Sequence, residues 1–191
     1  MRPALVDGLV LAGGAGRRFG RPKAVEPIGG GTLVERSVAL LMARCSGRVV
    51  VSCHPSIDLP LLPVDVVDDR PGPRAALNGL VAGLAELTAD HVVVLACDLP
   101  AVGGVLDRLI DATGDVVVAI DERGRRQPLC ARYPRQPTLV AAERLLAAGE
   151  LRLSSLLAEL GPIVEVAAGH GELANVNTVA DLEQWRRQRL G

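Results

Sequence analysis

The sequence predicts an α/β fold built around a mostly parallel sheet. Short runs rich in valine and leucine alternate with amphipathic stretches along the chain. Runs rich in valine and leucine are typical of strands buried on both faces of a parallel sheet. Amphipathic stretches are typical of the helices that connect such strands. With 191 residues, of which 49% are hydrophobic and 23% charged, the chain is long and apolar enough for one domain with a sizeable core, and this composition excludes intrinsic disorder.

The expected elements follow from the position of each run. Seven apolar runs are predicted to be strands: Leu5–Leu11, Arg48–Cys53, Val64–Val67, His91–Ala96, Asp115–Ile120, Pro128–Arg132 and Ile163–Val166. Six stretches between these runs are predicted to be helices: Thr32–Arg44, Arg74–Leu87, Val102–Ala112, Arg135–Ala148, Ser154–Leu160 and Val179–Arg189. In the first two, the apolar residues are spaced to share one helical face. Gly47 and Gly149 stand where the C-caps of two of these helices are expected.

Charge and cysteine usage narrow the class of protein. The formal net charge is −1, which argues against a dedicated nucleic-acid binder. No apolar run reaches transmembrane length, and nothing resembles a signal peptide, so we expect a cytoplasmic protein without a membrane partner. The four cysteines form no C-x-x-C pair, which argues against a zinc ribbon or a thioredoxin-type site and predicts small core residues.

A glycine-rich basic loop follows the first predicted strand. The segment from Leu11 to Lys23 contains four glycines and four basic residues, and Lys23 is the only lysine of the chain. Backbone N–H groups in such a loop can converge on phosphate oxygens, so a polyphosphate is the expected ligand. The segment lacks the Gly-Lys-Ser/Thr of a Walker A loop, and Phe19 stands where a dinucleotide fingerprint needs its third glycine. A surface loop with solvated arginines is the simpler alternative.

An aspartate follows the fourth predicted strand. Cys97-Asp98-Leu99-Pro100 comes directly after the Val-rich run His91–Ala96. The carboxyl end of a buried strand is the ligand side of a parallel sheet, and a carboxylate placed there suits Mg²⁺, which takes one or two protein carboxylates together with phosphates. The alternative for Asp98 is an N-cap of the helix expected near Val102.

These two segments carry a family resemblance. The sequence Leu-Ala-Gly-Gly, followed by a basic stretch and lysine, resembles the N-terminal signature of nucleotidyltransferases, and more narrowly that of the molybdenum cofactor guanylyltransferase family and its cytidylyltransferase relatives. Cys-Asp-x-Pro resembles the metal aspartate motif of that family. The resemblance implies a three-layer Rossmann-like nucleotidyltransferase fold with a mostly parallel, mixed central sheet, as a single domain over residues 1–191.

The resemblance also implies site residues. The nucleotide would be lined by Leu11, Ala12, Gly13 and Gly14. Lys23 would contact its phosphates, together with Arg17 or Arg18, and Asp98 would hold Mg²⁺. Asn175-Val176-Asn177-Thr178-Val179-Ala180-Asp181-Leu182 resembles a C-terminal family motif, in which Asn177 would be a second metal ligand. The alternative for that segment is a helix cap made by Thr178 and Asp181.

Two further segments resemble parts of the family's pocket. The run from Asp68 to Pro73 resembles an acidic residue followed by a Gly-Pro turn of the family. We favour Asp69 over Asp68 as the residue near the nucleotide. The alternative is that this run forms only an Asx turn before the bend. Arg74 to Leu77 lacks the glycine usual at this point, which Gly79 could replace. Arg126 to Tyr133 resembles a Pro-Leu strand near the acceptor. In the second strand, Ser52 and His54 are candidates for contact with the base.

The implied reaction is transfer of GMP from GTP to the terminal phosphate of molybdenum-loaded molybdopterin, with release of pyrophosphate, Mg²⁺ as cofactor, and molybdoenzyme chaperones as partners. A CTP-dependent molybdopterin cytidylyltransferase or a sugar-phosphate nucleotidyltransferase remains an alternative, because Pro22 stands where guanylyltransferases usually have Asp. A catalytically inactive nucleotide-binding adaptor and a dinucleotide-dependent oxidoreductase are the alternatives from other classes.

Overall fold

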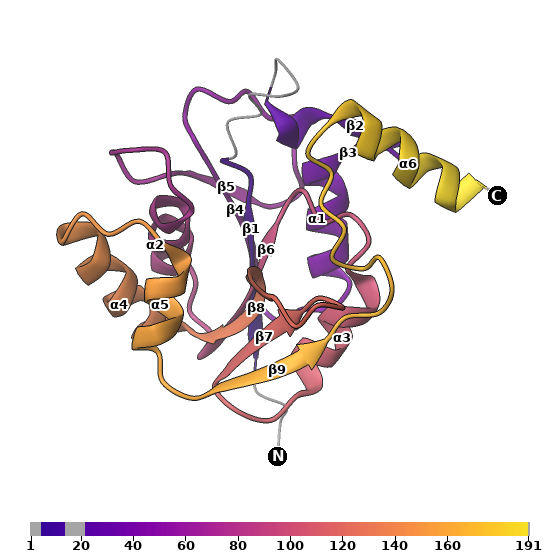
Figure 1. The fold of residues 1–191 in the computed structure, drawn as a ribbon. Helices are drawn as coiled ribbons and strands as arrows, with labels where there is room; N and C mark the ends of the chain where they lie inside the picture. The colour runs from indigo at the N-terminus through magenta and orange to yellow at the C-terminus, as the bar shows by residue number, and fades with distance from the viewer. Residues whose placement is uncertain (1–4, 14–21, 191) are drawn as a thin grey trace.

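The chain folds into three layers, with a central sheet between two groups of helices (Figure 1). The structure, a computed structural model, describes residues 5–13 and 22–190, with side chains to residue 187. Helices α1 (Leu33–Met42) and α3 (Gly103–Asp111) cover one face of the sheet. Helices α2 (Ala76–Glu86), α4 (Arg135–Ala147) and α5 (Leu153–Glu159) cover the other. Within the described ranges, no helix has the length and apolar character needed to span a bilayer.

The central sheet is mostly parallel and mixed, as the sequence predicted. Its strand order is β5-β4-β1-β6-β8-β7-β9, and β8 alone runs against its neighbours. The strands are β1 (Val6–Leu11), β4 (Val49–Cys53), β5 (Asp65–Asp68), β6 (His91–Ala96), β7 (Val116–Ile120), β8 (Arg126–Pro134) and β9 (Ile163–Ala167). All seven expected strands and all six expected helices are confirmed, with ends that differ from the prediction by two residues at most.

Three short elements were not anticipated. A 3₁₀ turn, η1 (Lys23–Val25), leads into a hairpin of β2 (Pro27–Ile28) and β3 (Gly31–Thr32). They contain two to three residues each, too few for a periodic pattern. Helix α6 (Val179–Leu190) lies over the hairpin (Figure 1), and the two segments share a small apolar cluster of Ile28, Leu33, Val176, Leu182 and Trp185.

A buried carboxylate fastens the amino-terminal end of β1. Asp7 is 2% exposed, and its two oxygens accept hydrogen bonds from the backbone N–H groups of Arg48 at 2.7 Å, Thr88 at 2.9 Å and Ala89 at 2.8 Å. One side chain therefore ties the segments that enter β4 and β6 to the central strand. A buried charge is tolerated here because hydrogen bonds replace its lost hydration.

The prediction that Gly47 caps a helix is wrong. Helix α1 ends at Met42, and the N–H of Gly47 donates instead to the Val6 carbonyl. A Cβ at this position would stand 2.1 Å from Oδ1 of Asp7, so glycine permits a close approach of the chain to the buried carboxylate. Gly149 does lie directly after α4 with φ at 73°, as expected of a C-cap glycine. The cysteines are free thiols, three of them buried.

We expect Asp7→Ala to lower the free energy of unfolding by about 3 kcal/mol or more, because it leaves buried N–H donors without an acceptor. Urea denaturation followed by circular dichroism measures the change. Asp65→Ala is the matched control, since Asp65 is 71% exposed in a surface ion pair with Arg48 and should change stability by no more than about 0.5 kcal/mol. Equal losses in the two variants would contradict the anchoring role.

Candidate active site

A cavity of about 340 Å³ opens at the carboxyl ends of β1 and β6. Its walls include Gly13 after β1, Lys23 from η1, Asp69 after β5 and Asp98 after β6. The first residues of α2, part of β8, and Asn175 from the segment before α6 also line it. The volume lies in the range of small-molecule sites, and the position is the ligand side expected of a parallel sheet. Segments far apart in the sequence therefore meet at one place.

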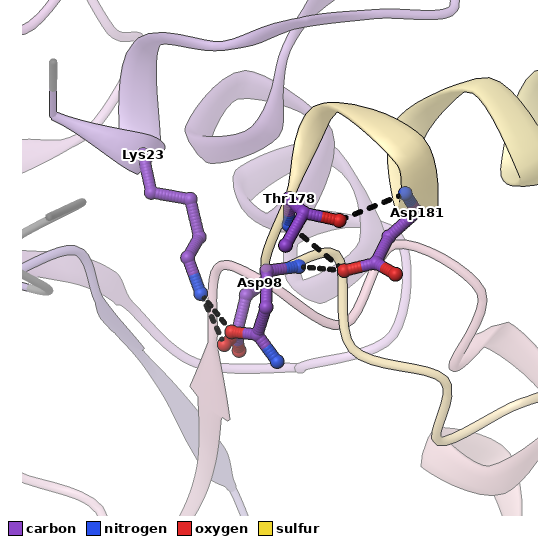
Figure 2. Close-up of polar contacts among 5 residues, drawn as sticks. Lys23, Asp98, Thr178 and Asp181 are labelled. Atoms are coloured by element: carbon purple, nitrogen blue, oxygen red, sulfur yellow. Dashed lines mark hydrogen bonds and ion pairs between the residues drawn. The ribbon is translucent and has the colours of Figure 1, made fainter. Parts of the chain in front are cut away.

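At the wall of this cavity, Lys23 contacts Asp98 (Figure 2), and it also contacts Asn177. Nζ of Lys23 donates to Oδ2 of Asp98 at 2.9 Å and to Oδ1 of Asn177 at 2.6 Å. The side chains of Lys23 and Asp98 are 13% and 19% exposed, so solvent screens this ion pair less than one on the open surface. The only lysine of the chain and the two residues predicted to hold a metal ion therefore lie together.

Asn177 is held by the turn that begins α6. Oδ2 of Asp181 accepts from the N–H groups of Asn177 and Thr178, both at 2.8 Å, and Oγ1 of Thr178 accepts from the N–H of Asp181 at 3.2 Å (Figure 2). Burial opposes ionisation of Asp181, but the hydrogen bonds from Asn177 and Thr178 outweigh it and lower the pKa of this carboxyl. The helix cap is present, and it orients Asn177, so the two interpretations of the segment are compatible.

A backbone hydrogen bond joins this turn to the end of β6. The N–H of Val176 donates to the carbonyl of Asp98 at 2.9 Å. Val176 is 2% exposed and belongs to the apolar cluster under α6, as does Ile28 from the hairpin that follows Lys23. The same small cluster therefore positions both Lys23 and Asn177 relative to Asp98.

A second acidic group, Asp69, lines the cavity. Oγ of Ser52 donates to Oδ1 of Asp69 at 2.6 Å, and the Asp69 N–H donates to the Cys53 carbonyl. The carboxylate approaches two glycines closely: a Cβ at Gly13 would stand 2.4 Å from Oδ2, and one at Gly79 would stand 2.8 Å from Oδ1. Burial raises the pKa of the Asp69 carboxyl, and the Ser52 hydrogen bond opposes this only in part.

The structure brings Asp69 rather than Asp68 to the cavity, because Asp68 is exposed on the edge strand β5. Leu11 and Gly13 also line it. Ala12 lies beneath, 1% exposed, with its N–H bonded to the Ser52 carbonyl. Gly14, Arg17 and Arg18 lie outside the described residues. Ser52 contacts Asp69, and His54 is hydrogen-bonded to Ser56 instead of lining the cavity.

A bulge brings part of β8 to the cavity. The pairing of β7 with β8 shifts between Val118 and Ala119, so that Ala119 pairs with Gln127 while Val118 pairs with Ala131. Gln127 and Leu129, within this irregular stretch, line the cavity. The buried Tyr133 hydroxyl donates to the Pro128 carbonyl at 2.8 Å and so holds the bulge.

The segment at the start of α2, which the family resemblance placed in the pocket, lies at the cavity. Arg74, Ala75 and Ala76 line the cavity with Gly79. A glycine inside a helix costs stability, so Gly79 was a signal that something approaches that face, and the structure identifies it as Asp69. Among the described residues, no three His, Cys, Asp or Glu side chains converge on one metal position. Asp98 and Asn177 instead offer two oxygens to one cation.

The comparison with known proteins decides the family. Residues 8–164 match the profile of the MobA-like NTP transferase domain. The chain belongs to the MobA-like NTP transferase family. Members of this family are nucleotidyltransferases, and the chain is an enzyme of that class. The resemblance inferred from the N-terminal motif and from Cys-Asp-x-Pro is confirmed, and so is the three-layer, Rossmann-like fold.

Relatives of this MobA-like enzyme span nearly its whole length. A probable molybdenum cofactor guanylyltransferase of Mycobacterium tuberculosis (strain ATCC 25618 / H37Rv) is 36% identical, over 92% of this chain and 90% of the relative. The crystal structure of molybdopterin-guanine dinucleotide biosynthesis protein A from Archaeoglobus fulgidus has a TM-score of 0.74 at 20% identity, over 95% of this chain and 97% of that one. The manganese complex of Rv0371C from Mycobacterium tuberculosis H37Rv has a TM-score of 0.67 at 22% identity, over 98% and 99%.

We expect Asp69→Asn to raise the free energy of unfolding at pH 7. The folded-state pKa of Asp69 is raised, so the folded protein binds this proton more tightly than the unfolded chain does. Wild-type stability is therefore lost as the pH rises from the unfolded pKa, about 3.9, through the folded value. The isosteric amide does not ionise and avoids this loss.

Urea denaturation of both proteins between pH 3 and pH 7 measures the effect, and the advantage of the Asp69→Asn variant should shrink toward about pH 3. Asp68→Asn is the matched control, because the neighbouring Asp68 is exposed and its removal should change little. A stability difference that stays constant across this range would show that Asp69 does not titrate as its burial implies.

Proposed function

We propose that this enzyme transfers GMP from GTP to the terminal phosphate of molybdenum-loaded molybdopterin and releases pyrophosphate. The observation that carries the proposal is that Lys23 and Asp98 line one cavity at the carboxyl end of the sheet and that Lys23 also contacts Asn177 beside it. The name of the Mycobacterium tuberculosis relative, at 36% identity, supports the choice of donor and acceptor. The enzyme would act in the cytoplasm, with molybdoenzyme chaperones receiving its product.

The donor nucleotide would lie across Leu11, Ala12, Gly13 and Gly14, with Asp69 beside it. Lys23 would place its ammonium on the triphosphate, helped by Arg17. Such donors, fixed before reaction, stabilise the negative charge that shifts between phosphates in the transition state. The cavity would hold donor and acceptor side by side. The reaction between them would then no longer depend on a chance encounter in solution, which lowers its entropic cost.

A divalent cation fits the site. Oδ2 of Asp98 and Oδ1 of Asn177 already accept from one cation, the Lys23 ammonium, and hard oxygens of this kind are the ligands that Mg²⁺ takes alongside phosphates. The manganese complex of the structural neighbour is consistent with a divalent ion in this fold. When bound, Mg²⁺ would neutralise charge on the phosphate oxygens.

Transfer would be direct, from donor to acceptor. A terminal phosphate oxygen of molybdopterin would attack the α-phosphorus of GTP, and the bond from that phosphorus to the pyrophosphate oxygen would break. The phosphate nucleophile is largely ionised at neutral pH and needs no strong base. Cys97 lines the cavity, but burial and the neighbouring Asp98 raise the pKa of its thiol to about 12, so it is protonated and unsuited to act as a nucleophile.

The test of the donor is equilibrium binding of GTP, CTP, ATP and NAD, each with and without Mg²⁺. The proposal requires a preference for GTP that depends on Mg²⁺ and is weakened in Lys23→Ala. Preference for CTP would favour the cytidylyltransferase alternative, which Pro22 supports. Binding of NAD without a metal effect would contradict the proposal. Binding of GTP without pyrophosphate release in the presence of molybdenum-loaded molybdopterin would indicate an inactive adaptor.

We expect Asp98→Asn to reduce turnover by about 100-fold or more, because the amide lacks the charge that would hold the divalent cation. Pyrophosphate release with GTP, Mg²⁺ and molybdenum-loaded molybdopterin measures this rate. Asp111→Asn, which changes an exposed carboxylate at the end of α3, is the matched control and should retain wild-type turnover. Near-normal turnover in Asp98→Asn would remove Asp98 from the catalytic machinery.

A further inference from the structure

The Lys23 ammonium occupies the two oxygens that the proposed function gives to a divalent cation. Its contacts to Oδ2 of Asp98 and Oδ1 of Asn177 measure 2.9 Å and 2.6 Å. An ammonium carries three N–H donors and no acceptor, and these two contacts use two of the donors. A divalent ion bound to the same pair would meet this positive charge at contact distance.

Two cations at one pair of oxygens repel each other strongly in a partly buried site. A divalent ion that binds by itself must therefore expel Lys23, whose side chain is only 13% exposed, from its contact with Asp98. The expelled ammonium would lose its charged partner, Asp98. A nucleotide triphosphate changes this balance, because its phosphate oxygens supply the ammonium with a new anionic partner.

We propose that Lys23 is a built-in cation that keeps the Asp98–Asn177 site closed to a divalent ion until a nucleotide triphosphate draws the ammonium away. The inference rests on the proposed function, since it assigns the metal to those two residues. The contact of Lys23 would then set the order of binding. The free metal ion would bind poorly, and the metal would enter together with the nucleotide. Without nucleotide, Lys23 takes the place of the metal ion. With nucleotide bound, it contacts the phosphates.

The surrounding contacts allow this exchange without a change of backbone. Asn177 is fixed through its own N–H by Asp181, and the backbone of Asp98 is fixed by the N–H of Val176. Neither anchor involves Lys23. The backbone of η1 is held by the hydrogen bond from the Glu26 N–H to the Lys23 carbonyl at 3.0 Å, so only the flexible four-carbon stem of the lysine has to turn.

The test is the affinity for Mn²⁺ in the absence of nucleotide, measured by electron paramagnetic resonance. We expect Lys23→Met to bind Mn²⁺ about tenfold more tightly than the wild type, because the competing charge is gone. Lys23→Gln, which retains donors but no charge, should change the affinity in the same direction. Arg144→Met is the matched control, since it removes one positive charge from a surface ion pair with Glu159 and should leave Mn²⁺ affinity at the wild-type value.

A double variant localises the effect. Lys23→Met combined with Asp98→Asn should lose the gain in Mn²⁺ affinity, and survival of the gain would place the ion elsewhere and overturn the inference. Unchanged or weaker Mn²⁺ binding in Lys23→Met would overturn it as well. Thermal unfolding checks that each variant folds, and added Mn²⁺ should raise the melting temperature of Lys23→Met more than that of the wild type.

Nucleotide binding separates this inference from the proposed function. We expect Lys23→Met to bind Mg²⁺ with GTP more weakly than the wild type, opposite in sign to its effect on Mn²⁺ alone. Tighter Mn²⁺ binding by the variant, with no binding of GTP to the wild type, would support the cation exchange and overturn the proposed function. If the wild type binds Mg²⁺ with GTP but Lys23→Met shows no gain in Mn²⁺ affinity, the proposed function would be supported and the cation exchange overturned.

Discussion

The contact of Lys23 with Asp98 and Asn177 is the constraint on which the arrangement of the site depends. It joins positions separated by 75 and 154 residues along the chain, so it forms only when the 3₁₀ turn, the end of β6 and the turn before α6 are all in place. The hairpin β2–β3 and helix α6 contribute little to the central layers, but they share the apolar cluster that holds two of these three segments. Their function in the fold is therefore to position the site.

The two ends of the sheet show how differently carboxylates can be used. At the amino end, Asp7 satisfies three backbone N–H groups and stabilises the sheet. At the carboxyl end, Asp69 has one hydroxyl donor and a raised pKa, and Asp98 depends on a lysine whose side chain can turn. Hydrogen bonds to a buried carboxylate therefore stabilise the amino end of the sheet, and the cavity end retains polar groups whose partners a nucleotide or a cation would replace.

The sequence was sufficient for the layers and for the main acidic residues, because strand and helix periodicity are local signals and Asp98 stands at the end of a strongly apolar strand. It was insufficient for contacts that depend on several elements at once. Gly47 looked like a helix cap, but its place is set by the buried Asp7, 40 residues away in the chain. That Lys23 and Asn177 would touch also could not be predicted, since neither the 3₁₀ turn nor the hairpin has a periodic pattern.

The departure of the sequence at Arg74 to Leu77 is explained by the packing of α2. Ala76, Gly79 and Gly83 lie at helical spacing on one face, and a Cβ at Gly83 would stand 2.1 Å from Cδ1 of Leu9 on β1. The small residues therefore let α2 lie close against the central strand. That closeness brings the first turn of α2 to the cavity and leaves Asp69 fitted between Gly79 and Gly13. Within this helix, Gly79 is the residue that permits the close approach of Asp69.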